Sequence, residues 1–572
     1  MKKYLALLLA LVMMLSMLAG CKPSGEDTKP SADTKPTTGT TEPKPTETTA
    51  DTTPAEPQVL TIGMPKQATV ENYDTQWMTK YIEENLNIDL QFVYFSSDTN
   101  ELMTQFGLMV SGNEKLPDIM WGTSIPFASL NEYGADGYIV PLNDYLTPEK
   151  APQLHETLTY AFDGVADKLM SYGISPIDGN QYAWPKLNEA TINAAHYFTY
   201  INTDWLKDLN LEMPTTVDEL YTVLKAFKEK DPNGNSKADE IAATGSMASF
   251  RASLPLFIMN AFVYTVEDYF WNATDGKVWA PYDTEEYRQG LIYLKKLVDE
   301  GLLDPGAFTI KTAKEMIPYW TPAENGDYIV GVISSYHTTS VDKTREDLFD
   351  NYDHLPWLKD ATGSGRGGFA PAFGHTYKYD TFVTKDCENV ELAVKFLDFM
   401  SNLEMTVTQQ TGELGVDWEW SNEGQNAYGL PVMRRNISNA SLWGAQNDKL
   451  WNVLGASIWT QQGTAKGFEN DGSYSSKSTM LSGRIFDTFQ AAPKPAETVM
   501  TLLYNEEEQE LVSEVEKVLK DYVNNSRALF ATGAMDPTDD ADWQEYLNGL
   551  KAQGMYEWQE AAQAAYDRMN GK

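Results

Sequence analysis

Hydrophobic and polar residues follow two different periods along the chain. Residues 59–64 and 88–95 form short β-rich runs, whereas residues 75–85 and 101–110 carry apolar side chains at helical spacing. This order of strand, helix, strand and helix predicts an α/β layer. Residues 116–121 then predict a short apolar strand whose carboxyl end is followed by a loop. Parallel sheets bind ligands at that edge.

Three further regions carry helical signals. Thr216 is followed three residues later by Glu219, which is the spacing of a capping box, and an apolar stripe continues from Val217. Residues 284–300 predict a second helix, with Gly301 placed to end it. The C-terminal region is helical in pattern almost throughout. This pattern extends over residues 506–570, and breaks are expected at residues 533–537 and at residue 554.

Composition indicates a folded protein of several domains. The 572 residues are 42% hydrophobic and 12% aromatic, which is enough apolar surface for a sizeable core. The chain carries 82 acidic and 44 basic residues, a formal charge of −38. Such a surface repels phosphate and anionic headgroups, so nucleic-acid binding and electrostatic membrane binding are disfavoured. Two cysteines cannot build a disulfide framework.

The first twenty residues have the pattern of an export signal. Lys2 and Lys3 precede the apolar residues 4–17, and small residues follow. Residues 18–21, Leu-Ala-Gly-Cys, resemble the lipobox of bacterial lipoproteins. The resemblance implies that residues 1–20 are a lipoprotein signal peptide and that Cys21 is lipid-modified, with palmitate as one of the expected acyl groups. A chance cysteine after an ordinary signal peptide is the alternative.

The next segment predicts a disordered tether. Residues 21–57 comprise Cys21 and a stretch that is rich in Thr and Pro and has almost no large apolar side chains. Such a segment cannot offset its ordering entropy by burial. At about 3.1 Å per residue, its extended limit is on the order of 100 Å. That reach suits a domain held off a membrane by a lipid anchor.

Several stretches together resemble the large extracellular solute-binding lipoproteins of carbohydrate ABC transporters, within the calcium-loop branch related to alginate- and oligosaccharide-binding proteins. No single stretch is decisive, but their order and spacing are specific. They are residues 202–206, 214–216, 231–240, 275–278, 287–291, 300–305, 391–398 and 564–568.

The resemblance implies a two-lobed α/β fold of the periplasmic-binding-protein type II class, with a helical C-terminal region. Ligand is expected in a cleft between the lobes, which close on binding. Lobe 1 is expected at residues 58–188 and 376–430, and lobe 2 at residues 189–375 and 431–572. The segments that cross between them are expected near residues 184–193, near 368–376 and beyond 429.

A loop after the capping-box helix places oxygen donors at alternate positions. Such spacing suits calcium, which takes six to eight oxygen ligands. Positions 6 and 12 are Ser236 and Ala242, so the glycine and the bidentate glutamate of an EF-hand are missing. Spacing alone leaves calcium and a plain Asn/Gly/Asp turn equally open. The loop resembles the shorter calcium loop of alginate binders, which implies a structural ion held by Asp231, Asn233, Asn235, the carbonyl of Lys237, Asp239 and Glu240.

Signals for catalysis are weak. Gly363, Gly365 and Gly368 satisfy G-x-G-x-x-G, but no strand precedes them and no helix pattern follows. The chain lacks H-E-x-x-H, G-x-S-x-G and a P-loop, and its five histidines are not spaced as metal ligands. A glycan-cleaving enzyme with a carboxylate pair stays open, because 82 acidic residues always offer some suitable pair. The resemblance favours a binder without enzymatic activity.

Aromatic residues in loop-like segments are the candidate ligand contacts, because sugar rings stack on aromatic faces and their hydroxyls need polar partners. Packing in the core is the alternative for the aromatic candidates, and solvated surface is the alternative for the polar candidates Arg366 and Glu413. A neutral oligosaccharide is favoured over a uronate polymer, since no basic cluster stands out near these residues. The candidates are Trp121, Tyr182, Trp184, Trp271, Trp357, Arg366, Glu413, Trp418 and Trp420.

The sequence therefore predicts a monomeric binding lipoprotein on the extracellular face of the cell membrane. It is expected to capture an oligosaccharide and deliver it to the permease subunits of an ABC importer. A peptide-binding transport receptor is the second binding alternative.

Overall fold

The protein is described by a computed structural model. The structure describes residues 56–162, 164–189, 197–248, 251–265, 270–320, 328–335, 350–360, 366, 375–421, 434–437, 442–459, 481, 484–485, 487–489 and 491–572. Cys21, the tether, the glycine-rich motif and much of the expected crossing segments lie outside these residues. Residues 56–572 form one compact unit.

A six-stranded mixed sheet forms the centre of the first lobe, in the order β14-β4-β11-β3-β1-β2. Strand β1 pairs in parallel with β2 and β3, and β11 runs antiparallel to both β3 and β4. The three strands expected near the start of the folded region are confirmed. The strands are β1 (Gln58–Pro65), β2 (Ile88–Phe95), β3 (Ile119–Met120), β4 (Trp184–Glu189), β11 (His375–Val383) and β14 (Ile458–Trp459).

Helices pack against this sheet through two apolar clusters. One cluster joins the sheet to the helices near β1 and β2, and the other surrounds Phe106 and Phe382. Residues 450–458, which the sequence analysis assigns to lobe 2, pack in the first of these clusters, because β14 pairs with β4. The elements of this part are η1 (Tyr73–Thr75), α2 (Trp77–Leu86), α3 (Thr99–Ser111), α4 (Phe127–Ala135), α5 (Pro152–Ala161), α6 (Ala166–Ser171), α12 (Val390–Met400) and α13 (Leu403–Thr411).

A second, four-stranded sheet has the order β10-β5-β9-β6. The capping box is confirmed, since the Thr216 hydroxyl accepts from the Glu219 N–H and the Glu219 carboxylate accepts from the Thr216 N–H. The elements are β5 (Thr199–Asn202), β6 (Ile241–Thr244), β9 (Val330–Ser334), β10 (Tyr352–His354), α7 (Thr203–Asp208), α8 (Val217–Glu229), α9 (Leu254–Met259), α10 (Glu285–Asp299), η3 (Pro305–Phe308) and α11 (Ala313–Trp320).

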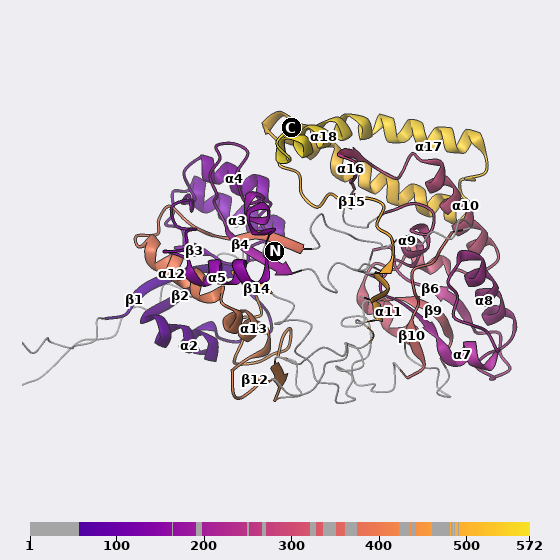
Figure 1. Ribbon diagram of the computed structural model, residues 1–572, viewed down its shortest axis with the longest axis horizontal. Helices are drawn as coiled ribbons and strands as arrows, with labels where there is room; N and C mark the ends of the chain where they lie inside the picture. The colour runs from indigo at the N-terminus through magenta and orange to yellow at the C-terminus, as the bar shows by residue number, and fades with distance from the viewer. Residues whose placement is uncertain are drawn as a thin grey trace, which may run out of the picture. The chain divides into compact units, whose positions relative to one another are not determined.

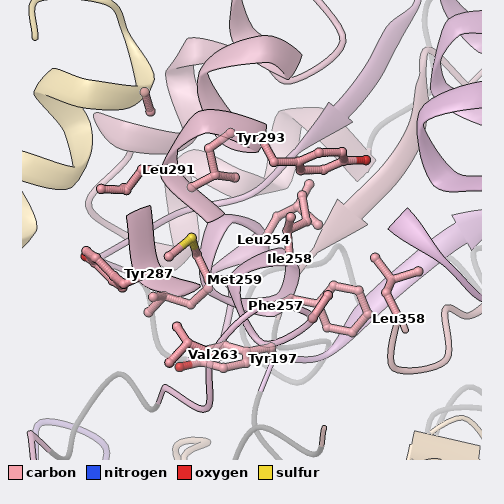
Figure 2. Packing of buried hydrophobic residues seen from close by; sticks show 14 of the residues in the cluster. Tyr197, Leu254, Phe257, Ile258, Met259, Val263, Tyr287, Leu291, Tyr293 and Leu358 are labelled. Atoms are coloured by element: carbon pink, nitrogen blue, oxygen red, sulfur yellow. The ribbon is translucent and has the colours of Figure 1, made fainter. Parts of the chain in front are cut away.

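The largest apolar cluster lies in this second lobe. Leu254, Ile258 and Met259 of α9 pack in this cluster with Leu291 and Tyr293 of α10 (Figure 2). The two helices approach closely because α10 carries Gly290, where a Cβ would meet the Met259 sulfur at 2.5 Å. Helix α10 ends as expected, with Gly301 at a φ of +66°.

The C-terminal region adds three helices that pack on the second lobe (Figure 1). Helix α16 contacts α10, and α18 contacts α16 and α17. The predicted breaks are confirmed, because helices end before residues 533–537 and again at Gly554. The remaining elements are α16 (Glu506–Ala531), α17 (Asp540–Ala552), α18 (Met555–Met569), a three-stranded sheet of β15 (Glu497–Thr498), β7 (Asn272–Thr274) and β8 (Lys277–Trp279), and a ribbon of β12 (Trp418–Trp420) and β13 (Arg434–Asn436).

The sheets and the helices that pack on them confirm the predicted α/β class, and α16, α17 and α18 confirm the helical C-terminal region. Within the described part of the chain, no helix is both long and apolar enough to span a membrane.

Candidate functional site at the carboxyl edge of the first sheet

The chain turns sharply where β3 ends. The Gly122 N–H donates to the Thr381 hydroxyl at 3.0 Å, and the Thr123 N–H donates to the Asp380 carbonyl at 2.8 Å. Gly122 has a φ of +58°, and a Cβ there would meet the Leu454 carbonyl oxygen at 2.6 Å. Only glycine fits this position. The turn therefore brings β3, β11 and the residues just before β14 together at the carboxyl edge.

A charged cluster lies beside this turn. Lys186 of β4 donates to Asp380 of β11 at 3.1 Å and to the Leu454 carbonyl at 2.7 Å. Lys378 lies 3.3 Å from the same Asp380 carboxylate. The Asp380 side chain is only 2% exposed, against 20% for Lys186 and 60% for Lys378. Two ammonium groups against one carboxylate leave a local excess of one positive charge.

Burial lowers the pKa of Lys186, and the repulsion from Lys378 acts in the same direction. The attraction of Asp380 opposes this shift. Such a cluster can donate to ligand hydroxyls or carboxylates through both lysines. We call Lys186, Lys378 and Asp380 the edge cluster.

Tyr377 and Tyr379 alternate with Lys378 and Asp380 along β11, so their rings lie on the other face of the strand. Tyr377 of β11 stacks on Tyr172 with ring centroids 4.6 Å apart and planes within 13°. Tyr377 is half-buried, while Tyr172 and Tyr379 are almost completely buried. The Tyr379 hydroxyl donates to the Leu169 carbonyl at 2.6 Å. The Tyr377 ring is therefore partly accessible on the face of β11 opposite to the charged groups.

Most of the predicted aromatic contacts lie in the core instead. Their exposed fractions are at most 6%, which leaves no ring face for stacking on a ligand in this structure. The set comprises Trp121, Tyr182, Trp184, Trp271, Trp357 and Trp418.

Trp121 illustrates why these residues are buried. Its ring packs edge-on against Trp451 at 5.7 Å and Phe396 at 5.5 Å, and its Nε1 donates to the Val453 carbonyl at 3.3 Å. Gly455 completes the contact, since a Cβ there would meet the Trp121 ring at 2.3 Å. The partners are more than 270 residues distant in sequence. Loop-like composition around a tryptophan therefore did not reveal its burial.

The other five rings are also held by specific contacts, several of them with residues distant in sequence. Trp184 donates to the Ser401 hydroxyl at 2.7 Å, and Trp418 donates to the Gly412 carbonyl at 2.9 Å. The Tyr182 ring covers Gly134, where a Cβ would meet it at 2.5 Å. Trp271 packs edge-on against Trp558, and Trp357 stacks on Phe257, each with centroids 5.1 Å apart.

Three predicted contacts are less enclosed. Trp420 is 41% exposed on the β12–β13 ribbon. Glu413 lies 3.8 Å from the Lys449 ammonium. Arg366 donates to the Ala261 carbonyl at 2.7 Å and lies 3.6 Å from Asp360, so its guanidinium already has protein partners. The structure does not bring Trp420, Glu413 and Arg366 together with the edge cluster through any contact among the described residues.

The candidate metal loop is held by hydrogen bonds within itself. The Asp231 carboxylate accepts from the N–H groups of Asn235 at 3.1 Å and Ser236 at 2.9 Å. The Asn233 and Asn235 side-chain amides both donate to Asp239 at 3.3 Å. Ser236, at the position of the EF-hand glycine, has a φ of +61°. The loop thus makes the sharp turn of a calcium loop despite the serine.

Glu240 closes the loop and is 3% exposed. Its Oε1 has no hydrogen-bond partner among the described residues. Burial raises the pKa of Glu240, and the nearby Asp231 and Asp239 carboxylates raise it further. An unpaired buried carboxylate oxygen beside two other carboxylates is a donor set that fits a divalent cation. However, no group of three or more His, Cys, Asp or Glu side chains in the described part of the chain is already arranged as a metal cage.

The edge cluster was missed by the sequence analysis. Lys186 and Asp380 are separated by 194 residues and meet only because β4 pairs with β11. One signal was available, since Lys186 interrupts an otherwise apolar run from Tyr182 to Leu187.

Comparisons with known proteins place these features in context. A sequence relative, the fructooligosaccharide ABC transporter substrate-binding protein FusA of Streptococcus pneumoniae, is 25% identical over 85% of this chain and 86% of its own. The structure of a FusA EF-hand mutant in complex with fructo-nystose has a TM-score of 0.69 at 21% identity, covering 90% of this chain and all of that one. An HMO-binding, ABC-transporter-associated solute-binding protein of Bifidobacterium longum infantis has a TM-score of 0.69 at 18% identity, over 89% of this chain and 99% of that one.

The structural similarities confirm the predicted two-lobed fold of a solute-binding protein. They also agree with the sequence similarity in pointing to a binder rather than an enzyme. The family model described as bacterial extracellular solute-binding protein matches residues 68–406, which is more than half of the chain. The chain therefore belongs to the family of bacterial extracellular solute-binding proteins.

Proposed function

We propose that the protein captures an oligosaccharide outside the cell and delivers it to the permease subunits of an ABC importer. The observation that carries the proposal is the edge cluster at the carboxyl edge of the first sheet. Open α/β sheets bind their ligands at this edge. The name of the FusA relative, which aligns over most of both chains, supports an oligosaccharide as the ligand.

The chemistry of the edge suits a carbohydrate. A sugar presents an apolar C–H face, which can pack on an aromatic ring, and hydroxyls, which need donors and acceptors. Lys186 and Lys378 supply donors for the hydroxyls. The local excess of positive charge also tolerates a carboxylate, so uronates belong among the ligands to be tested beside neutral sugars.

A structural calcium ion in the loop of residues 231–240 is a second part of the proposal. It is supported by the oxygen donors at alternate positions and by the buried Glu240 Oε1, which has no hydrogen-bond partner among the described residues. The Asp231, Asp239 and Glu240 carboxylates, the Asn233 and Asn235 side chains and the Lys237 carbonyl would hold the ion. The ion would neutralise these carboxylates and stabilise the turn between α8 and β6.

A lipid anchor at Cys21 completes the proposal. It is supported by the lipobox-like Leu-Ala-Gly-Cys sequence and by the Thr- and Pro-rich residues that follow. Such an anchor would hold the folded region at the outer face of the cell membrane.

Thermal unfolding against a panel of ligands tests the function. Thermal unfolding of the protein lacking residues 1–21 is measured in the presence of calcium and of one class of ligand at a time: neutral oligosaccharides, uronates or peptides. A ligand at 100 times its Kd adds about 2.7 kcal/mol, which shifts the Tm by a few degrees. The proposal predicts a shift with a glycan that is recovered uncut. Recovery of cleaved glycan would indicate a hydrolase, and a response to peptides alone would indicate a peptide receptor.

A further inference from the structure

Strand β2 ends the first sheet on one side. Its neighbours are β1, which pairs with it in parallel, and the elements α2 and η1 (Figure 1). The carbonyls of Asn87 and Phe95 accept hydrogen bonds from β1 and the residue after it. The Leu90 N–H instead points outward and donates to the Glu83 carboxylate at 3.1 Å.

Because backbone groups alternate sides along a strand, Leu90, Phe92 and Tyr94 share this outward direction. Among the described residues, the N–H groups of Phe92 and Tyr94 have no hydrogen-bond partner beyond the sheet. The Glu83 carboxylate occupies the place that a carbonyl of a further strand would take at Leu90. The outer edge of β2 is thus open at Phe92 and Tyr94.

A groove of about 370 Å³ follows this open edge. It is lined on one side by β2 and on the other by η1 and α2. Tyr94 is 40% exposed. The lining residues are Asp74, Lys80, Glu83, Asp89, Leu90, Gln91, Phe92 and Tyr94.

The usual protections of an edge strand are weak here. Natural edges are shielded by proline, bulges, short length or outward lysines. Strand β2 has eight residues, contains no proline and pairs with β1 in unbroken register. Lys80 lines the groove but is bound to Glu83 at 2.7 Å. Lys66 covers the Tyr94 ring at 5.1 Å, at the far end of the groove.

The charge of the groove selects the partner. Asp74, Glu83 and Asp89 against Lys80 give the lining a net charge of −2. A second copy of this chain would bring an equally acidic groove on a protein of charge −38, so self-pairing is repulsive. A basic segment is attracted instead, and its backbone can satisfy the outward N–H groups.

We propose that the open edge of β2 is a docking site for an extended, basic segment of another polypeptide, which adds to the sheet as a new strand. The N–H and C=O groups of Phe92 and Tyr94 pair with the segment. Asp74 and Asp89 bind its lysine or arginine side chains. This site is separate from the edge cluster and does not depend on the ligand proposed above.

Peptide binding with hydrogen exchange tests the site. The probe is a capped seven-residue peptide that alternates lysine and valine, and its controls are the glutamate–valine counterpart and an alternately N-methylated version. The protein variants are D74K/D89K and, as a matched control, E507K/E510K on exposed positions of α16. Unchanged melting temperatures show that the variants are folded.

The basic peptide is expected to bind and to slow exchange of the amides of residues 90–94. D74K/D89K is expected to weaken binding about tenfold, while E507K/E510K stays within about twofold. The acidic and N-methylated peptides are expected not to bind. Equal binding of the N-methylated peptide, equal weakening in both variants, or unchanged exchange at residues 90–94 would each overturn the proposal.

Discussion

Lys186 donates to the buried Asp380 carboxylate at 3.1 Å, and this pair joins β4 to β11 at the carboxyl edge of the first sheet. Strand β4 begins in the first segment expected to cross between the lobes, residues 184–193, and β11 begins at the end of the second, residues 368–376. The pair is therefore placed to support the fold and to meet ligand at the same time.

Replacing Asp380 by asparagine is expected to reduce the free energy of unfolding by about 2–3 kcal/mol, because Lys186 loses its charged partner in a mostly buried site. Chemical denaturation measures this loss. The control is Lys378→Gln, whose side chain is 60% exposed and which is expected to change stability by less than about 0.5 kcal/mol. Equal effects of the two substitutions would contradict the structural role of the Lys186–Asp380 pair.

The proposed calcium loop predicts a metal-dependent melting temperature. Calcium at 100 times its Kd is expected to stabilise the protein by about 2.7 kcal/mol, and a chelator is expected to reverse the shift. Glu240→Gln is expected to abolish the response, whereas Glu229→Gln on the exposed side of α8 is expected to retain it. A full calcium response in the Glu240 variant would argue against this loop as the site.

The raised pKa of Glu240 gives the metal-free protein a pH dependence of defined sign. The folded state holds this proton more tightly than the unfolded state, so the contribution is present at low pH and is lost as pH rises through the raised pKa. Calcium is expected to remove the effect by favouring the ionised carboxylate. Chemical denaturation of wild type and Glu240→Gln is followed from pH 4 to 7, with and without calcium. The difference between their free energies of unfolding at each pH measures the contribution of Glu240.

His354 predicts a loss of stability in acid. Burial lowers its pKa to about 4, and its ring contacts the Thr199 carbonyl at 3.1 Å and the Thr488 hydroxyl at 2.8 Å. The unfolded histidine, with a pKa near 6.5, takes up a proton first as pH falls. Roughly 3 kcal/mol is therefore lost between about pH 6.5 and 4. His354→Gln is expected to show a shallower pH dependence than wild type, and parallel curves for the two proteins would refute this assignment.

The Trp121–Gly455 contact predicts a large effect of one methyl group. Gly455→Ala is expected to destabilise the protein by about 2 kcal/mol or more, because its Cβ would lie 2.3 Å from the indole. Gly107→Ala in α3 is the matched control, since its Cβ would meet only the Tyr133 hydroxyl at 3.4 Å. This control is expected to be neutral or to stabilise by up to about 1 kcal/mol. Thermal and chemical unfolding compare the two variants, and a tolerated Gly455→Ala would contradict the packing described for Trp121.

Local signals predicted local structure well. The capping box at Thr216 and the terminating Gly301 correctly predicted where α8 begins and where α10 ends, because caps depend on neighbours within a few residues. The same holds for the breaks between the C-terminal helices.

Features made by distant residues were less predictable. The pairing of β14 with β4 carries residues 450–458 into the first core, although their sequence gives no sign of it. The burial of Trp121 and Trp184 likewise depends on partners more than 200 residues away. A sequence pattern reports the period of a segment but not the segment that packs against it.

The most direct test of the account is calorimetric titration of the glycan that gives the largest thermal shift into wild type and Lys186→Gln. The account predicts one site per chain on the wild type, an intact ligand afterwards, and affinity at least about tenfold weaker for the variant, which loses a charged donor. Control titrations use Lys449→Gln, whose ammonium binds Asp417 on another part of the chain and which is expected to bind as wild type does. Wild-type affinity in Lys186→Gln, or ligand cleavage by the wild type, would contradict the account.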